Sequence, residues 1–69
     1  MDNDANEKEV FLASKGFKFH STEEVWRSSA GELSRNFVDD NSLTEIKRQL
    51  SKAEKTAEFR KEPFKLYNH

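Results

Sequence analysis

The chain has 69 residues, of which 36% are charged, and the charges nearly cancel to a net charge of −1 at pH 7. This length allows one domain with a small core, and the absence of cysteine excludes disulfides and thiolate zinc sites. No run approaches the roughly 20 apolar residues of a membrane span, and the first residues lack the basic and apolar regions of a signal peptide. We therefore expect a soluble, cytoplasmic protein without a membrane partner.

The first half of the chain divides into a polar start and a segment with regular turns. Residues 1–8 are polar and acidic, so we expect a flexible N-terminus. Two Ser-x-Gly triplets follow, at residues 14–16 and 29–31, and each lies between short apolar segments. A three-residue hairpin loop that ends in a left-handed glycine has this form. The pattern predicts a small antiparallel β-meander over about residues 9–37, with strands at residues 9–13, 17–21, 24–28 and 32–37.

The same residues also fit helices, and this alternative stays open. Ser21 and Glu24 have the spacing of a capping box at the start of a helix that would run on to Phe37. Gly16 fits the left-handed cap that would end an earlier helix. Against a helix, Gly31 in its middle costs about 1 kcal/mol relative to alanine. We prefer the sheet, and the alternative is an all-α three-helix bundle.

Residues 42–60 form the clearest element, an amphipathic helix. Ser42 is its N-cap, and Glu45 completes a capping box. Pro63 prevents the helix from continuing, because a proline disfavours helical backbone at the residue before it. The apolar positions recur along one face: Leu43, Ile46, Leu50, Ala53 and Ala57. A sheet followed by this helix predicts an α+β fold, with a single domain over residues 9–60.

The C-terminal tail, residues 61–69, has apolar side chains after the helix has ended. Phe64, Leu66 and Tyr67 lie in a segment that is too short to form a core of its own. They either fold back onto the domain or engage another chain, and an exposed sheet edge accepts such a segment in the same molecule or in a second one. The small core also allows a homodimer.

No residue pattern in the chain predicts catalysis, a cofactor or a metal site. His20 and His69 have no metal-ligand spacing with other residues, and no nucleophile motif is present. The adjacent carboxylates Asp39 and Asp40 fit the chemistry of a helix start. With two glycines in all, the chain has no phosphate-binding loop. We therefore expect a protein that is not an enzyme.

The C-terminal part of the chain is basic. Its last 23 residues hold seven Lys or Arg against three Glu, and four of the cations share the polar face of the helix: Lys47, Arg48, Lys52 and Lys55. Such a face can follow phosphates by charge. A solvated face with ion pairs to nearby glutamates is the interpretation that we prefer, because Glu54, Glu58 and Glu62 weaken the positive potential. A nucleic-acid-binding module that uses this face is the alternative function.

Aromatic and arginine side chains form the other candidate surface. In the predicted hairpin, Arg27 and Arg35 would lie near each other on neighbouring strands, and Trp26 would point to the opposite face. Trp and Arg are the residues that most often anchor protein interfaces. With Phe64 and Tyr67 of the tail, these residues predict a protein-binding surface. The alternative for Trp26 is a place in the core.

Short strands followed by residues 42–50, SLTEIKRQL, resemble the small phage and plasmid accessory domains that join a short meander to a helix. Over residues 16–57 the arrangement is also similar to the three-strand-plus-helix DNA-binding domains of tyrosine integrases, although the near-neutral charge departs from their basic pattern. The resemblance is one of architecture and implies an accessory or regulatory role. We expect a small non-enzymatic interaction protein that acts by binding a protein partner.

Overall fold

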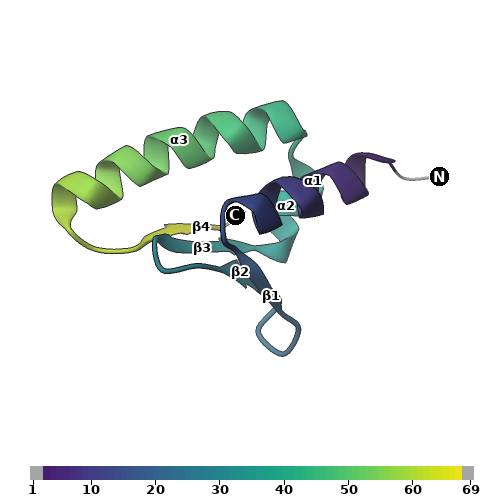
Figure 1. Cartoon of the computed structure of the whole chain (residues 1–69), viewed down its shortest axis with the longest axis horizontal. Coiled ribbons are helices and arrows are strands. Elements are labelled where there is room, and N and C mark those ends of the chain that lie inside the picture. The colour runs from purple at the N-terminus through teal and green to yellow at the C-terminus, as the bar shows by residue number, and fades with distance from the viewer. Residues whose placement is uncertain (1–2, 68–69) are drawn as a thin grey trace.

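The structure, a computed structural model, describes residues 3–67 (Figure 1). Helices and a sheet make an α+β fold, as predicted, and the all-α alternative is wrong. In residues 3–67 no helix combines the length and the apolar character that crossing a membrane requires. The elements follow in the order α1 (Asn3–Ser14), β1 (Lys18–His20), β2 (Val25–Arg27), β3 (Gly31–Ser34), α2 (Arg35–Asp40), α3 (Leu43–Arg60) and β4 (Phe64–Leu66).

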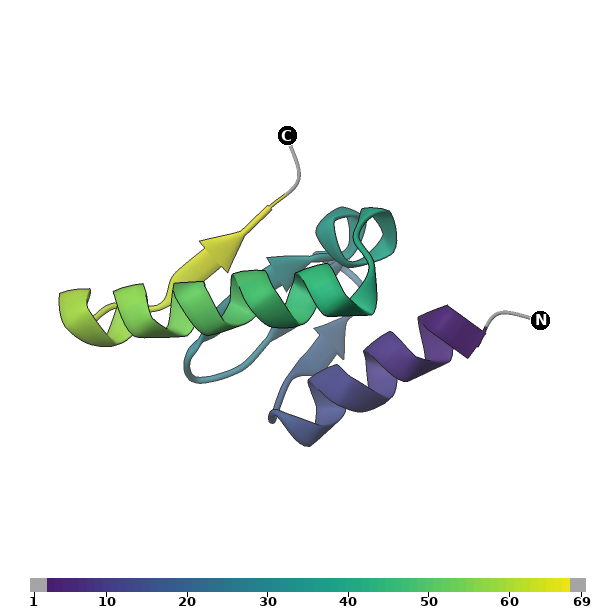
Figure 2. The ribbon, with the colours of Figure 1, turned by 90° about the horizontal axis from the view of Figure 1, so that it is seen from above.

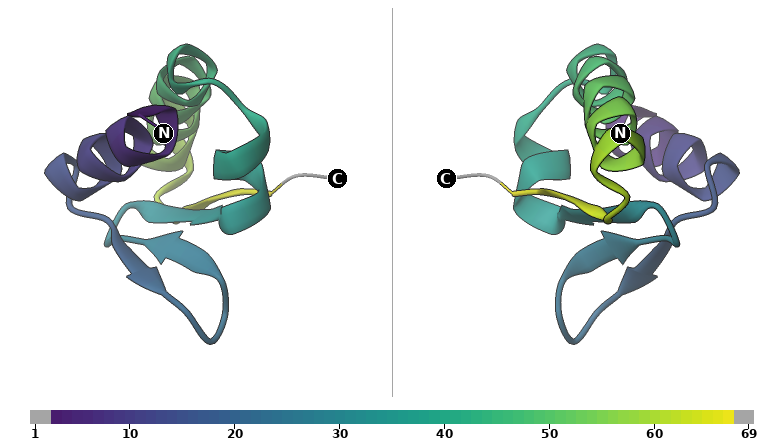
Figure 3. Two further views of the ribbon diagram at one scale, coloured as in Figure 1. Left: turned by 90° about the vertical axis from the view of Figure 1, so that its right-hand side faces the viewer. Right: turned by 90° about the vertical axis from the view of Figure 1, so that its left-hand side faces the viewer.

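The four strands form one mixed sheet in the order β1-β2-β3-β4. The first three strands form an antiparallel meander, whereas β4 pairs with β3 in parallel, with Phe64 opposite Gly31. α1 and α3 lie over one face of the sheet, and α2 lies beside the end of β3 (Figures 1 and 3). β1 and β4 are therefore the two edges of the sheet.

The strand predicted over residues 9–13 is wrong, because these residues belong to α1. Gly16 has a φ of +93°, and its N–H donates to the carbonyl of Ala13 at 3.0 Å. The N–H of Phe17 donates to the carbonyl of Leu12, also at 3.0 Å. These two bonds form a Schellman cap, and the side chains of Phe17 and Leu12 are both buried in the core. The first Ser-x-Gly triplet thus ends a helix, as the helical alternative held.

α1 also takes up most of the segment for which the sequence predicts a flexible N-terminus. The helix begins at Asn3, and residues 1–2 lie outside the described residues. Lys8 Nζ donates to the carbonyl of Val38 at 2.9 Å, and Lys15 forms an ion pair of 3.7 Å with a glutamate of α3. α1 is therefore attached to both α2 and α3.

The hairpin between β2 and β3 is present, but its turn is one residue shorter than predicted. Ser28 and Gly31 exchange two backbone hydrogen bonds, of 2.8 and 3.3 Å, which leaves Ser29 and Ala30 in the loop. Gly31 is the first residue of β3 and does not have a positive φ. A Cβ on Gly31 would lie 2.5 Å from Cγ of Phe64, so the glycine allows β4 to approach β3 closely.

β3 ends where the sequence predicts a strand that continues to Phe37. Ser34 has extended backbone, and its Oγ accepts the N–H of Phe37 at 3.1 Å, which caps α2. Phe37 and Val38 of this short helix are buried. The strand predicted over residues 32–37 is therefore correct only as far as Ser34, because a serine N-cap starts a helix there.

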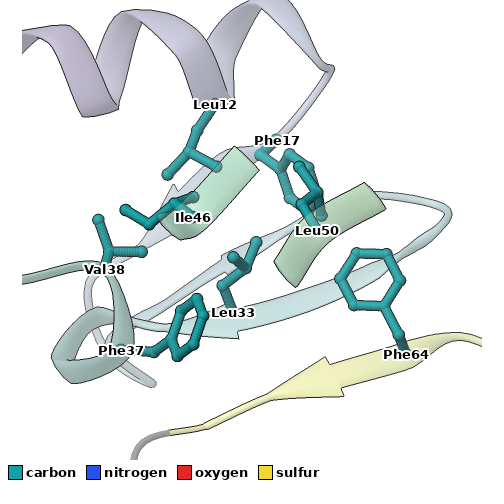
Figure 4. Packing of buried hydrophobic residues seen from close by; sticks show 8 residues of the cluster. All are labelled: Leu12, Phe17, Leu33, Phe37, Val38, Ile46, Leu50 and Phe64. Carbon is teal, nitrogen blue, oxygen red and sulfur yellow. The ribbon is translucent and has the colours of Figure 1, made fainter. Parts of the chain in front are cut away.

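α3 confirms the helix predicted over residues 42–60. Ser42 Oγ accepts the N–H of Glu45 at 3.1 Å, as the capping box requires. Ile46 and Leu50 on the apolar side of α3 are buried. The core that they share draws on all three helices, on β3, on β4 and on the residue before β1 (Figure 4). Its other members are Leu12, Phe17, Leu33, Phe37, Val38 and Phe64.

The C-terminal tail folds back onto its own domain. Phe64 is buried with 8% of its surface exposed, and its ring lies 6.2 Å from that of Phe17, measured between centroids. Of the two arrangements open to the tail, the structure has the one in which it joins the sheet of the same molecule. Residues 68–69 lie outside the described residues.

Lys61 follows α3 in the left-handed conformation, with φ 60° and ψ 39°. This conformation disfavours any residue with a Cβ by about 1 kcal/mol. We expect Lys61→Gly to raise the free energy of unfolding, measured by urea denaturation, by about 0.5–1 kcal/mol, because glycine is the favoured residue at this cap. Lys61→Ala keeps the Cβ and is the control, with an expected change within about 0.5 kcal/mol. A glycine variant no more stable than the alanine variant would contradict this expectation.

Candidate binding groove between α3 and β4

A groove of about 660 Å³ runs between α3 and β4. In Figure 2, which looks down onto the helices, β4 emerges beside α3 and does not lie beneath it. The helix lines the groove with residues three or four positions apart, which share one side of α3. These residues are Gln49, Lys52, Ala53, Thr56, Ala57 and Arg60, and β4 contributes all three of its residues.

The floor of the groove is apolar. Ala53 and Ala57 are half-buried, and both pack against the core, as does Leu66 of β4. The small alanine side chains leave space beside β4 that a leucine at the same positions would fill. The apolar stripe of α3 therefore has two roles: its first part fills the core, and its last part forms the groove.

The rim of the groove is basic. Lys52 and Arg60 of α3 and Lys65 of β4 are exposed, and within residues 3–67 none of the three forms an ion pair. Among the described lining residues, Glu62 alone is acidic. Phe59, at the i+7 position from Lys52, lies on the same side of the helix and is 89% exposed. The rim thus has cations that form no ion pair, and an exposed aromatic side chain lies next to it on α3.

β4 also has a free edge. The N–H of Phe64 donates to the carbonyl of Ala30 at 3.2 Å, so the backbone of Phe64 faces β3. Because successive residues of a strand turn their backbone groups to opposite sides, the N–H and C=O of Lys65 face away from β3. No strand of residues 3–67 lies on that side. One wall of the groove therefore carries unpaired backbone groups.

The aromatic residues predicted to bind a protein do not form one surface. Trp26 is half-buried and packs against the core, and its ring centroid lies 5.2 Å from that of Phe19. Phe64 is buried and reaches the groove only from below. Tyr67 is exposed and donates a hydrogen bond to Glu32. The predicted surface is therefore divided between the core, the groove and the outer face of the sheet.

Arg27 and Arg35 do not lie beside each other, contrary to the prediction. Arg27 is opposite Glu32 in the sheet and forms ion pairs of 2.8 Å with Glu23 and 3.0 Å with Glu32. Arg35 begins α2, where its side chain lies 3.6 Å from Asp39. The two arginines belong to separate ion-pair clusters, because the strand that was expected to carry Arg35 ends before it.

Arg27 dominates the electrostatics of the outer face of the sheet. The hydrogen bonds that Arg27 donates to Glu23 and then to Glu32 raise the pKa of its guanidinium. The bond from Arg27 lowers the pKa of the Glu32 carboxyl. Burial, followed by the hydrogen bond to Glu32, raises the pKa of the Tyr67 hydroxyl. These groups satisfy one another, so Arg27 is not free to bind a carboxylate of a partner.

Two of the four cations predicted to contact nucleic acid already have partners. Lys47 Nζ lies 5.4 Å from the centroid of a phenylalanine ring of α1. Arg48 Nη2 donates to Glu45 at 2.8 Å, which lowers the pKa of that carboxyl. Lys52 and Lys55 are exposed, and within residues 3–67 they form no ion pair. Of the four, Lys52 is the one that lines the groove.

Within residues 3–67 no group of three or more histidine, aspartate or glutamate side chains is placed to hold a metal ion. His20 is exposed at the end of β1, and His69 lies outside the described residues.

The groove itself was not predicted from the sequence, nor were Thr56, Arg60 and Lys65 as residues of a site. Two signals were present in the sequence: alanines at two positions of the apolar stripe, and a short apolar segment after Pro63. Neither signal shows that the segment lies next to the alanines. Comparison of the chain with protein-family models, with curated proteins and with solved structures finds no match.

Proposed function

We propose that the protein is a small non-enzymatic interaction protein that binds an extended segment of a protein partner in the groove between α3 and β4. The observation that carries this proposal is a helix face and a free strand edge on either side of one apolar floor. Grooves of this construction hold extended peptides through main-chain hydrogen bonds to the strand and through pockets for alternate side chains. The volume of about 660 Å³ is in the usual range for binding sites.

Apolar contacts favour a protein over a polyanion as the partner. The floor at Ala53, Ala57 and Leu66 and the exposed ring of Phe59 match the apolar side chains of a peptide, and phosphate groups would leave them unused. The net charge of −1 gives no general attraction to nucleic acid. The nucleic-acid alternative relies on the outer face of α3, where Arg48 is already bound to a glutamate.

The proposal is tested by selecting binders from a phage-displayed library of random peptides and mapping their site by amide chemical shifts. We expect the shifts to fall on α3 and β4. Thr56→Trp, at an exposed residue that lines the groove, should occupy the space and weaken binding by roughly tenfold or more. Ser51→Trp is the matched control, because Ser51 is exposed on the opposite side of α3.

Two results would overturn the proposal. In the first, the selected peptides bind both tryptophan variants equally. In the second, their shifts fall outside the groove. Binding of duplex DNA at low salt, with shifts at Lys47, Arg48 and Lys55 and a steep loss of affinity on added salt, would support the nucleic-acid alternative in its place.

A further inference from the structure

We infer that the partner segment is acidic and that it adds to β4 as a fifth strand of the sheet. This inference rests on the proposed function and names the chemistry of the partner. It follows from two independent features of the groove, which are the direction of the free backbone groups and the sign of the free charges.

The backbone of β4 is oriented to accept another strand. Phe64 and Leu66 turn their N–H and C=O groups towards β3, as the bond from Phe64 to the carbonyl of Ala30 requires. Lys65 turns both of its groups away from β3, and by the same alternation the N–H of Tyr67 faces that side. An extended chain alongside β4 can therefore bond to both groups of Lys65 and to the N–H of Tyr67. A helical or irregular partner would leave these groups unpaired.

The free charges around the groove select the composition of that strand. Lys52, Arg60 and Lys65 line the groove against Glu62, and within residues 3–67 none of the three cations forms an ion pair. Lys65 lies opposite Glu32 in the sheet, but Glu32 is already bound to Arg27. The whole chain has a net charge of −1, so this excess of positive charge is local to the groove. Carboxylates on an added strand would meet cations on both the helix and the strand side.

The same charges disfavour a second copy of this chain as the occupant. If the β4 edges of two molecules paired, the Lys65 side chains would approach each other, together with Lys52 and Arg60 of both molecules. Like charges placed opposite each other destabilise a strand pair, and a lysine in the middle of an edge strand discourages self-pairing. Of the chain's own acidic N-terminal segment, residues 3–8 lie in α1, at the end of the molecule away from the groove (Figure 2).

The test uses three short synthetic peptides in which a central valine is flanked on each side by two residues, which are all glutamate, all glutamine or all lysine. Successive residues of a strand face opposite sides, so with the valine on the apolar floor the outermost residues face Lys52 and Arg60 and the residues next to the valine face the side of Lys65. We expect the glutamate peptide to bind with at least roughly tenfold lower Kd than the glutamine peptide, and the lysine peptide to bind more weakly than either. Isothermal titration calorimetry at low salt measures the affinities, and amide chemical shifts confirm the site.

Two further comparisons, one of protein variants and one of peptides, distinguish the effect of charge on binding from the effect of main-chain hydrogen bonds to β4. Lys52→Glu/Arg60→Glu should abolish the preference for glutamate. Lys18→Glu/Lys55→Glu makes the same change of net charge at exposed residues outside the groove lining and should retain the preference. A glutamate peptide N-methylated at alternate amides keeps its charge but loses one bonding edge, and it should bind at least roughly tenfold more weakly. The parent peptide should also slow hydrogen exchange at the amides of Lys65 and Tyr67.

The outcomes distinguish this inference from the proposed function. Equal affinity for the glutamate and glutamine peptides would overturn the acidic preference, and unchanged binding of the N-methylated peptide would overturn strand addition. If library-selected peptides occupy the groove while the glutamate peptide does not bind, this inference fails and the proposed function stands. If no peptide contacts the groove, both fail.

Discussion

Gly31→Ala is expected to lower the free energy of unfolding by about 2–3 kcal/mol, because the added methyl group has no space. Its Cβ would lie 2.5 Å from both Cγ and the carbonyl oxygen of Phe64, and 2.6 Å from Cδ2. The ring can rotate away, but the carbonyl belongs to the pairing of β4 with β3 and cannot move without disturbing it. Urea denaturation measures the loss, and the amide of Leu66, which faces β3, should exchange faster with solvent.

Gly16→Ala is the matched control for this substitution. Nothing lies within 4 Å of a Cβ at Gly16, but its φ is +93°. The expected cost is therefore about 1 kcal/mol, from the left-handed backbone alone, and the Leu66 amide should keep its protection. If Gly31→Ala cost no more than Gly16→Ala, the close packing of Phe64 against β3 would be disproved.

Leu12→Ala is expected to lower the free energy of unfolding by about 3 kcal/mol, as for other leucines truncated in a packed core. Leu12 has 0% of its surface exposed and joins α1 to the core of α3 and the sheet. A domain of this size has a total stability of only roughly 3–10 kcal/mol. The variant should therefore show a marked loss of the folded population in thermal denaturation followed by circular dichroism.

Val10→Ala, on the same helix, is the control for Leu12→Ala. Val10 is 61% exposed, so its truncation should change the stability by no more than about 0.5 kcal/mol. Equal and small effects of the two substitutions would mean that α1 does not dock on the rest of the domain. In that case the strand predicted over residues 9–13 would again have to be considered.

α3 and the hairpin of β2 and β3 could be predicted because their signals are local. The capping box of Ser42 and Glu45 and the proline stop at Pro63 lie at the two ends of one element. The hairpin needs only a turn between two short segments, and Ser28 and Gly31 close it within four residues. In both cases the residues that decide the structure are neighbours in the sequence.

The local sequence pattern does not show whether residues 9–13 form a helix or a strand. Residues 10–13 are four apolar residues in a row, which fit neither the period of a helix nor that of a strand. Gly16 fits both a hairpin loop and a helix cap. The helix is favoured because Leu12 and Phe17 become buried together against α3, and this contact is not visible in the sequence.

β4 and the groove depend on residues that are far apart in the chain. In the sequence Gly31 looks like a turn residue, and its role as the space for Phe64 exists only once β4 has joined the sheet. Ala53 and Ala57 fit the core stripe of an amphipathic helix as well as they fit the floor of a groove. The candidate site could therefore not be predicted from sequence patterns. The sequence did indicate that the apolar side chains of the tail need a surface to pack on.

The parallel pairing of β4 has a consequence for how the domain is held together. β1, β2 and β3 are connected by short turns, whereas β4 returns to β3 only after the chain has passed through α2 and α3. Closing this long loop costs more chain entropy than closing a hairpin, so we expect the docking of β4 to be a late step in folding. The partner segment proposed above would bridge β4 and α3 and so reinforce this closure. If it binds there, mass action would increase the folded population as its concentration rises above the Kd, and the persistence of the protein would depend on the presence of that partner.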